Sequence, residues 1–483
     1  MPRKANTGFG LADGGETARE VGMREMLVGT RTVTLPETAA DDLILPLFRR
    51  EEVLVIGAAA QAAARHAVDK AAAAFGALAG VSPEAISDFY RRFAAGIRDD
   101  AAWTQVAAAN KEDVARAQSR GRPVGRLALS DGMRAAMAEG LEGWAVAPHR
   151  VGEVLEVREA ETFRIERRRA PLGLVAFVFE GRPNVFADGA GVLRSGNCAV
   201  MRIGQDAQGT AEAMMRVILA PALRDSGLPE GAITLVESRD RAAGQALFAD
   251  TRLRLAVARG SGQAVATLGA IAEQHGIPVS LHGTGGAWMY LAADARLPVA
   301  LAAVRSSLDR KVCNTLNTLV FDAKLSQDFR ANIVELLGNL GAKVHATAPC
   351  RSDFPNALPL EESGLAEEWE WDDAPEVSVT QSADLDDMAR LFNAYSPRFV
   401  ASIISGGGTE SFERFYQALE APYVCNGFTR WVDGQWAWLR PELGLTNWER
   451  GRLLGRSGIL SGDDLFSVRE VFIDTTGKAP QGR

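Results

Sequence analysis

The sequence contains few cysteines and no long apolar run. Only four of its 483 residues are cysteine, and none forms a C-x-x-C pair or the cysteine and histidine spacing of a zinc site. We therefore expect a reduced, cytoplasmic protein with no disulfide framework and no metal centre. No stretch approaches the roughly 18 consecutive apolar residues that span a bilayer, and the N-terminus lacks the apolar segment of a signal peptide. A membrane is therefore not an expected partner.

Positive charge is not in excess either. Lysine and arginine number 53 against 61 aspartate and glutamate residues, which gives a formal net charge of −8. This mildly acidic balance argues against a nucleic-acid partner, because phosphate backbones are bound by basic surfaces. With 47% hydrophobic and 24% charged residues, the composition is typical of globular proteins, and the length predicts two or three domains.

Apolar runs and helical segments alternate along most of the chain. Strands are expected at 172–179, 198–202, 232–236 and 253–258, and a second series at 316–321, around 344 and 377, and at 400–405. Helical patterns lie between them, which predicts an α/β fold with two doubly wound parallel-sheet domains. Residues 58–120 read as packed helices. The alternating segments 151–169 and 466–474 are typical of an exposed antiparallel ribbon.

The first predicted sheet lacks the G-x-G-x-x-G fingerprint of dinucleotide-binding folds after its opening strand. A glycine-rich turn, Arg259-Gly260-Ser261-Gly262, lies instead at a later junction between a strand and a helix. Free N–H groups at such a helix N-terminus suit a phosphate. An ordinary turn would use glycine as well, so both interpretations stay open.

Two further residues have the chemistry and the position of site residues. Asn184 follows Arg182-Pro183 at the carboxyl end of a predicted strand, where ligands bind in open α/β sheets; its alternative role is to cap the next helix. Cys313 lies in a polar loop beside Arg310 and Lys311, and cationic neighbours favour the nucleophilic thiolate. The alternative for Cys313 is a buried filler.

A series of short motifs keeps its order along the chain. They are Arg168–Gly173, Glu180–Val185, Arg194–Arg202, Gly227–Pro229, Arg259–Gly262, Val312–Thr315 and Asn426–Arg430. This series resembles the γ-glutamyl phosphate reductases, also called glutamate-5-semialdehyde dehydrogenases, a branch of the aldehyde dehydrogenase superfamily. The resemblance covers about residues 58–474.

The resemblance implies a domain plan. Residues 57–145, 170–290 and 431–465 would form the dinucleotide-binding domain, and residues 291–430 the catalytic domain. Residues 146–169 and 466–483 would form an oligomerisation ribbon and tail, so a homodimer or a larger homo-oligomer is expected. Residues 1–56 are an N-terminal extension to which the sequence assigns no role.

The resemblance also implies a reaction, the reduction of an acyl phosphate to an aldehyde by NADPH through a cysteine thioester. Cys313 would be the nucleophile, and the Asn184 amide and the Cys313 N–H would stabilise the oxyanion. Arg202 would meet the 2′-phosphate of NADPH, unless it is an ordinary solvated arginine, and the 259–262 turn would bind the cofactor. The expected substrate-binding residues are Arg182, Asn314, Asn426, Thr429 and Arg430. An amino-acid kinase would supply the acyl phosphate.

Several positions depart from the family pattern. Leu308-Asp309-Arg310 replaces Gln-Arg-Pro, Asn317 replaces a glutamate, Phe399-Val400-Ala401 replaces a His-Ser-Asp/Glu stretch, and Trp288 replaces a histidine. The tryptophans at 431, 436, 438 and 448 would line a pocket or pack at a junction. The acyl group is therefore left open. A CoA-acylating or simple aldehyde dehydrogenase and a non-catalytic binding subunit remain alternatives.

Overall fold

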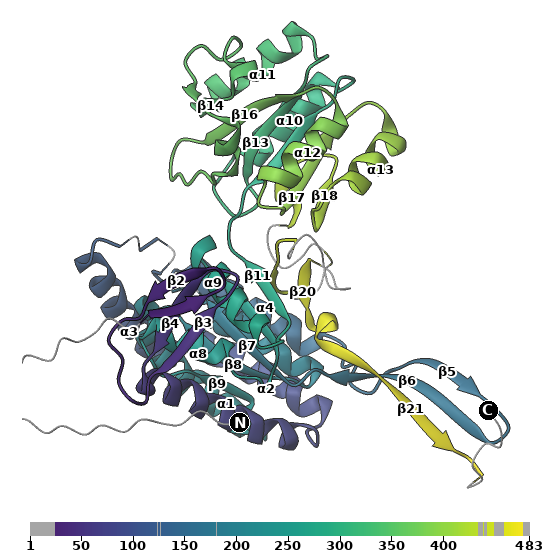
Figure 1. Ribbon diagram of the computed structural model, residues 1–483. Coiled ribbons are helices and arrows are strands. Elements are labelled where there is room, and N and C mark those ends of the chain that lie inside the picture. The colour runs from purple at the N-terminus through teal and green to yellow at the C-terminus, as the bar shows by residue number, and fades with distance from the viewer. Residues whose placement is uncertain are drawn as a thin grey trace, which may run out of the picture.

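A computed structural model describes residues 25–122, 124–125, 127–179, 181–432, 438, 442–448 and 458–476. The chain forms two lobes, each built around a parallel sheet, and a narrow ribbon that extends from the first lobe (Figure 1). The predicted pair of parallel-sheet domains is therefore confirmed. Among the helices of these residues, none combines the length and the apolar character needed to cross a membrane.

The sheet of the first lobe has the strand order β11-β10-β7-β8-β9. Its strands are β7 (Leu174–Phe179), β8 (Cys198–Ile203), β9 (Ile233–Leu235), β10 (Leu253–Arg259) and β11 (Val279–His282), and all neighbours are parallel. Every residue of β7 and β8 is buried. A strand covered by helices on both faces has no solvent side, which is why these strands read as continuous apolar runs.

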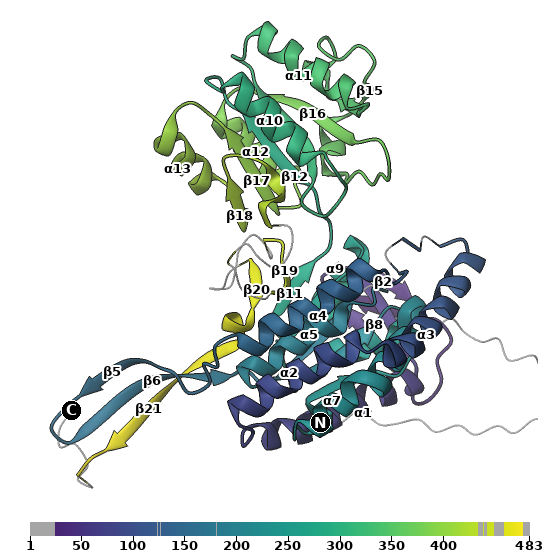
Figure 2. The same ribbon diagram turned by 180° about the vertical axis from the view of Figure 1, so that it is seen from behind.

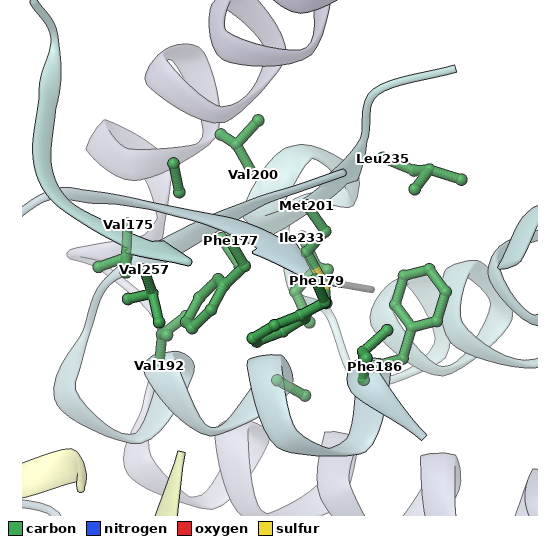
Figure 3. Close-up of a cluster of buried hydrophobic side chains, with 14 of the residues drawn as sticks. Val175, Phe177, Phe179, Phe186, Val192, Val200, Met201, Ile233, Leu235 and Val257 are labelled. Carbon is green, nitrogen blue, oxygen red and sulfur yellow. The ribbon is translucent and has the colours of Figure 1, made fainter. Parts of the chain in front are cut away.

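Helices cover both faces of this sheet. One face carries α1 (Ala58–Leu78), α8 (Arg241–Phe248) and α9 (Gly262–Gln274); the other carries α2 (Pro83–Arg98), α4 (Asp131–Val146) and α5 (Val185–Ala190), as Figure 2 shows from behind. The helices α3 (Asp100–Ser119), α6 (Gln208–Met214) and α7 (Ala220–Asp225) complete the lobe. Phe177 of β7 points toward Val192, which comes after α5 in the chain (Figure 3). Phe179 of β7 and Phe186 of α5 belong to the same buried apolar cluster. This buried apolar layer fixes the end of β7, where Asn184 lies.

Two hairpins precede α1. They are β1 (Glu25–Val28) with β2 (Arg31–Thr34), and β3 (Leu43–Leu47) with β4 (Glu52–Ile56). Leu45, Leu47 and Ile56 belong to the core of the first lobe, and Gln274 of α9 donates to the Pro46 carbonyl at 2.8 Å. Residues 43–56 are therefore part of this lobe, although the sequence predicted an extension up to residue 56.

The sheet of the second lobe has the order β15-β14-β16-β13-β12-β17-β18 and is parallel throughout. The strands are β12 (Ala287–Leu291), β13 (Leu316–Asp322), β14 (Lys343–Ala346), β15 (Leu358–Pro359), β16 (Glu376–Ser382), β17 (Val400–Ile404) and β18 (Tyr423–Cys425). The helices are α10 (Leu297–Ser307), α11 (Gln327–Asn339), α12 (Leu385–Tyr395) and α13 (Gly408–Ala418). The predicted domain boundary at 290 falls inside β12. Only four residues separate β11 from β12, so no helical segment marks this transition in the sequence.

The ribbon consists of β5 (Val154–Glu159), β6 (Phe163–Pro171) and β21 (Phe466–Asp474), in the antiparallel order β21-β6-β5. It extends away from the first lobe (Figure 1). Every residue of β5 is exposed. The apolar side chains that face solvent on the ribbon are Val154, Leu155, Val157, Val468 and Phe472. The predicted antiparallel ribbon is present; its role in oligomerisation remains a prediction.

Candidate active site

The carboxyl edge of the first sheet lies next to the amino edge of the second sheet. In the first lobe the carboxyl ends of β7, β10 and β11 form one edge, and β11 continues through residues 283–286 into the amino end of β12. In the second lobe Ala287 pairs with Leu316 and Val400, and Val400 pairs with Tyr423, so four strands begin at the same level. Cys313 lies three residues before β13. The register therefore puts this thiol at the amino edge of the second sheet. It lies beside residues 283–286, which form the crossing between the lobes.

The loop that carries Cys313 is held by hydrogen bonds from several segments. The Cys313 carbonyl accepts the Gly286 N–H of the crossing at 2.7 Å. The Asn314 carbonyl accepts the Thr429 hydroxyl at 2.7 Å, and the Thr315 hydroxyl donates to the Arg310 carbonyl at 2.7 Å. Backbone groups fixed in this way hold the loop in one conformation. The thiol is half-buried.

The other three cysteines are poor nucleophiles for a physical reason. Burial raises the pKa of Cys198 and of Cys350 to about 12. Burial also raises the pKa of Cys425, whose Sγ faces the carbonyls of Ala401 and Gly427 at 3.7 and 3.9 Å. Because the reactive species is the thiolate, burial in apolar surroundings disfavours all three. Cys313 is the thiol whose position suits chemistry.

Residues from both lobes converge on Cys313. The Tyr423 ring at the start of β18 is buried, and its hydroxyl accepts the Thr446 N–H at 3.3 Å. Burial raises the pKa of Tyr423, the negative charge of a Cys313 thiolate acts in the same direction, and Arg259 acts in the opposite one. Arg259 comes from the end of β10 and pairs with Asp188 of α5 at 3.5 Å. A phenol of the second lobe thus lies within electrostatic reach of the thiol and of an arginine of the first.

His282 and Phe399 form the neighbouring contact between the lobes. Their ring centroids are 4.9 Å apart, and Phe399 also meets Tyr423 edge-on at 5.1 Å. Phe399 is fully buried and shares an apolar cluster with Tyr423 and Val432 against which Cys313 packs. Burial, together with the positive charges of Arg259 and Arg182, lowers the pKa of His282 to about 3. The imidazole is therefore neutral in the folded protein at physiological pH.

The depressed pKa of His282 predicts a pH dependence of stability. Between about pH 3 and 6.5 the unfolded chain binds a proton at this imidazole and the folded chain does not, so the unfolding free energy falls as the pH drops below 6.5. From about pH 7.5 to 5 this loss is on the order of 2 kcal/mol. The variant His282→Gln should lack that part of the pH dependence in urea unfolding. An equal pH dependence in both proteins would contradict the assignment.

Lys311, a predicted cationic neighbour of the thiol, has a partner of its own. Its ammonium lies 2.9 Å from Glu368 and 3.8 Å from Glu370. The side chains of Lys311 and Glu368 are only 7% and 17% exposed, so this is a largely buried ion pair. The positive charge expected to act on Cys313 is therefore balanced by a carboxylate that sequence reasoning did not anticipate.

Asn184 lies at the N-cap of α5, but its side chain forms no capping hydrogen bond among the described residues. Its alternative role as a helix cap is therefore contradicted. The α5 helix that it precedes is tied to Arg259 through Asp188, which brings the Asn184 segment and the 259–262 turn together at the carboxyl edge of the first sheet. The charge of Arg182 acts on His282 at the same edge.

The predicted cofactor residues divide into a turn and a buried arginine. Gly260 donates its N–H to the His282 carbonyl at 3.2 Å, and α9 begins directly after Ser261, whose side chain forms no capping bond. A Cβ on Gly262 would lie 2.7 Å from the Thr284 hydroxyl. Arg202 is 6% exposed and donates to the Asp240 carbonyl at 3.1 Å before α8. It is not a solvated arginine.

The predicted substrate residues after β18 are mostly structural in this conformation. Thr429 is fully buried and bonds to the Asn314 carbonyl, and Arg430 pairs with Asp309 at 2.5 Å. Asn314 is fully buried too, and neither amide atom of its side chain has a hydrogen-bond partner among the described residues. Asn426 is exposed. Contact of these residues with a substrate stays a prediction.

The tryptophans follow no common role. Trp431 lies against the apolar cluster next to Cys313, 6.3 Å from the Tyr423 ring, and Trp438 is 61% exposed. Trp448 donates its backbone N–H to the Arg398 carbonyl at 2.9 Å. Trp436 lies outside the described residues, as do Glu180 and residues 1–24.

Three residues near the thiol were missed by sequence reasoning. Tyr423 and Glu368 belong to no motif, and only the strand register and side-chain contacts bring them to Cys313. His282 had a usable signal, because it ends an apolar run directly before the glycine-rich segment 283–286. A histidine at the carboxyl end of a parallel strand is a candidate site residue.

Comparison with known proteins agrees with this geometry. The model of the aldehyde dehydrogenase family matches residues 38–348. The chain belongs to the aldehyde dehydrogenase family. It is 32% identical over 356 residues to the γ-glutamyl phosphate reductase of Syntrophomonas wolfei, an alignment that covers 72% of this chain and 83% of that protein. Within the family, the chain is therefore an oxidoreductase of the γ-glutamyl phosphate reductase, or glutamate-5-semialdehyde dehydrogenase, type, as the sequence motifs predicted.

Solved structures share the fold. The γ-glutamyl phosphate reductase of Thermotoga maritima superposes with a TM-score of 0.78 at 24% identity, covering 87% of this chain and 100% of that chain. The glyceraldehyde-3-phosphate dehydrogenase of Methanocaldococcus jannaschii, whose structure contains NADP, has a TM-score of 0.60 at 16% identity, covering 86% of this chain and 95% of that one. The predicted aldehyde-dehydrogenase-like fold is confirmed.

Proposed function

We propose that the protein reduces an acyl phosphate to an aldehyde, with NADPH as the reductant and a thioester on Cys313 as the intermediate. The observation that carries this proposal is the half-buried Cys313 beside the 283–286 crossing between the lobes, where it packs against the apolar cluster of Phe399 and Tyr423. The relatives named γ-glutamyl phosphate reductase support an acyl phosphate as the substrate class.

In this proposal the Cys313 sulfur forms a bond to the acyl carbon while the bond from that carbon to the phosphate oxygen breaks, and inorganic phosphate leaves. The Asn184 amide and the Cys313 N–H would hold the negative charge that develops on the carbonyl oxygen. After reduction of the thioester, the carbon–sulfur bond of the thiohemiacetal breaks, the aldehyde leaves and the thiolate is restored. Covalent capture divides one difficult step into two easier ones.

A nicotinamide dinucleotide would supply the hydride that reduces the thioester carbon. Two features of the first lobe fit such a ligand: α9 begins directly after a turn whose Gly262 leaves no room for a Cβ, and the buried Arg202 has an Nε without a hydrogen-bond partner among the described residues. Arg259, Gly260, Ser261 and Gly262 would hold the pyrophosphate, and Arg202 the 2′-phosphate that distinguishes NADPH from NADH.

The function is tested by oxidising a panel of aldehydes with NADP in the presence of inorganic phosphate, and separately with coenzyme A. Phosphate-dependent NADPH formation would support the proposal. Formation that depends on coenzyme A, or on neither, would identify the acylating or simple aldehyde dehydrogenase instead. The panel should contain glutamate-5-semialdehyde together with apolar and aromatic aldehydes, because Phe399 and Trp288 stand where the family has polar residues.

The role of Arg202 gives a separate prediction. Replacing it with glutamine should raise the KM for NADPH about 10- to 100-fold, since a charge-assisted bond to a phosphate is lost. The KM for NADH should change little, because NADH has no 2′-phosphate. Steady-state kinetics with both cofactors measure this. An equal loss with both would mean that Arg202 only supports the start of α8 through the Asp240 carbonyl.

The ribbon predicts a homo-oligomer. An exposed β5 edge that carries the apolar side chains of Leu155 and Val157 is a surface that natural proteins pair or cover. We expect a dimer or a larger assembly in sedimentation velocity at micromolar concentration, and a shift toward monomer in the variant L155K/V157K. A wild-type protein that sediments as a monomer would contradict this prediction.

Two further parts of the proposal concern the setting of the reaction. None of the four cysteines, all of which lie in the described part of the chain, forms a disulfide, which is compatible with the reducing cytoplasm, where we place the protein. An amino-acid kinase would be its functional partner, because an acyl phosphate is made by phosphorylating a carboxylate.

A further inference from the structure

The segment Glu367–Trp369 lies outside every sequence motif and is fastened to the strand that follows Cys313. The Asn317 amide of β13 donates to the Glu367 carbonyl at 2.8 Å and accepts the Trp369 N–H at 2.9 Å. Asn317 is 3% exposed and comes four residues after the nucleophile. One side-chain amide therefore fixes the backbone on both sides of Glu368.

The Glu368 carboxylate joins two segments that flank Cys313. One oxygen accepts the Gly285 N–H of the crossing at 2.6 Å, and the other accepts the Lys311 ammonium at 2.9 Å. Gly285 touches the nucleophile as well, because a Cβ there would lie 2.5 Å from the Cys313 carbonyl oxygen and 2.6 Å from Glu368 Oε1. The carboxylate, the crossing and the cysteine backbone are thus packed without room for a methyl group.

The far end of this segment is anchored too. The Trp369 indole N–H donates to the Ser378 hydroxyl at 2.8 Å, and the ring stacks on His345 with centroids 3.8 Å apart and an interplanar angle of 10°. His345 belongs to β14 and Ser378 to β16, two strands that are separated from β12 by β13 in the order of the sheet. The Glu368 segment is therefore a rigid support that connects the nucleophile loop to the body of the second sheet.

We infer that Glu368 is a positioning residue for Cys313, acting through Lys311 and Gly285. The family pattern has a carboxylate at position 317; in this chain Asn317 instead holds a segment that brings a carboxylate from position 368. Breaking a buried ion pair by removing one partner leaves an uncompensated charge, so single neutral variants should be more harmful than the double one. The inference rests on the proposed function only where turnover is measured.

The first measurement is kinetic. Glu368→Gln and Lys311→Met should each lower kcat about 10- to 100-fold with a smaller change in KM, because a small displacement of a nucleophile costs rate rather than binding. Lys311→Arg should retain most of the activity, and the double variant should recover part of the loss. Asp353→Asn is the matched control: the Arg330–Asp353 pair spans 3.0 Å in the same lobe, with side chains 9% and 20% exposed, and its loss should leave kcat unchanged.

The second measurement needs no substrate. The rate of Cys313 alkylation by iodoacetamide, followed by peptide mass spectrometry with Cys425 as the internal reference, should fall about threefold or more in Lys311→Met and rise by a similar factor in Glu368→Gln. The signs differ because each variant leaves the opposite charge beside the thiol, whereas Glu370 and Tyr423 are unchanged. A purely structural role would move both rates the same way.

The outcomes are distinct. Unchanged alkylation and unchanged kcat in Glu368→Gln and Lys311→Met would overturn the inference, even if both variants lost thermal stability. Alkylation changes of opposite sign in a protein that reduces no acyl phosphate would support the inference and reject the proposed substrate class instead.

Discussion

Replacement of Cys313 by alanine is expected to abolish turnover. Without the sulfur no thioester forms, so kcat should fall by about 10⁴-fold or more, the scale seen when an enzyme loses its nucleophile. Binding of NADPH should stay within about twofold, because affinity would reside in the first lobe and only the covalent step is removed. Rapid-mixing kinetics and NADPH fluorescence titration measure the two effects separately.

The control for this variant is Cys425→Ala. Cys425 is also half-buried, but its Sγ faces backbone carbonyls at the end of β18, and its loss should leave turnover nearly unchanged. Unchanged activity in Cys313→Ala would eliminate the covalent route. If the wild-type protein itself showed no turnover with any aldehyde or acyl phosphate, the non-catalytic alternative would stand.

Replacement of Asn184 by alanine is expected to lower kcat about 10²- to 10³-fold with little change in KM. The reason is the loss of one donor to the carbonyl oxygen, whose negative charge is largest in the transition state. The variant should fold as stably as the wild type, because the Asn184 side chain forms no capping bond to α5. Urea unfolding and steady-state kinetics test both statements.

Ser82→Ala is the matched control for Asn184. The Ser82 hydroxyl caps α2 and accepts the Ala85 N–H at 3.2 Å, far from the crossing between the lobes. Its loss should cost about 0.5 to 2 kcal/mol of unfolding free energy without changing kcat. If Asn184→Ala instead lost stability and retained activity, the residue would be a structural element of α5 and the oxyanion role would be abandoned.

The scaffold could be predicted from the sequence wherever the burial of a strand produces a recognisable pattern of apolar residues along the chain. The strands β7 and β8 are nearly continuous apolar runs because helices cover both of their faces, and the ribbon alternates because its faces are exposed. The β11 and β12 strands were missed because they are short and are separated by a glycine-rich bend rather than a helix. The β3–β4 hairpin lies in the segment to which the sequence assigned no role, because its packing against α9 is a tertiary contact that no local pattern contains.

The candidate site residues that could be predicted are those whose own motif indicates a chemical role. Cys313 and Asn184 were identified from their loops and their places after or before strands, and the structure removed the alternative of Asn184 as a helix cap. The pairing of Lys311 with Glu368 was not predictable, because 57 residues separate them and the contact depends on how Asn317 fastens a distant segment. A sequence shows which charged residues are close along the chain, but it does not show the distant residues with which they pair in the folded protein.

The bend at 283–286 has a mechanical consequence. This bend connects β11 of the first sheet directly to β12 of the second. The Asn447 side chain holds it by accepting the Gly283 N–H and by donating to the carbonyls of Thr284 and Pro397. If the lobes rotate apart about this bend to exchange a nucleotide, residues far from the bend are displaced most and residues beside it least. The Cys313 carbonyl accepts the Gly286 N–H of this bend, so in such a motion the sulfur would move little while the 259–262 turn moved farther.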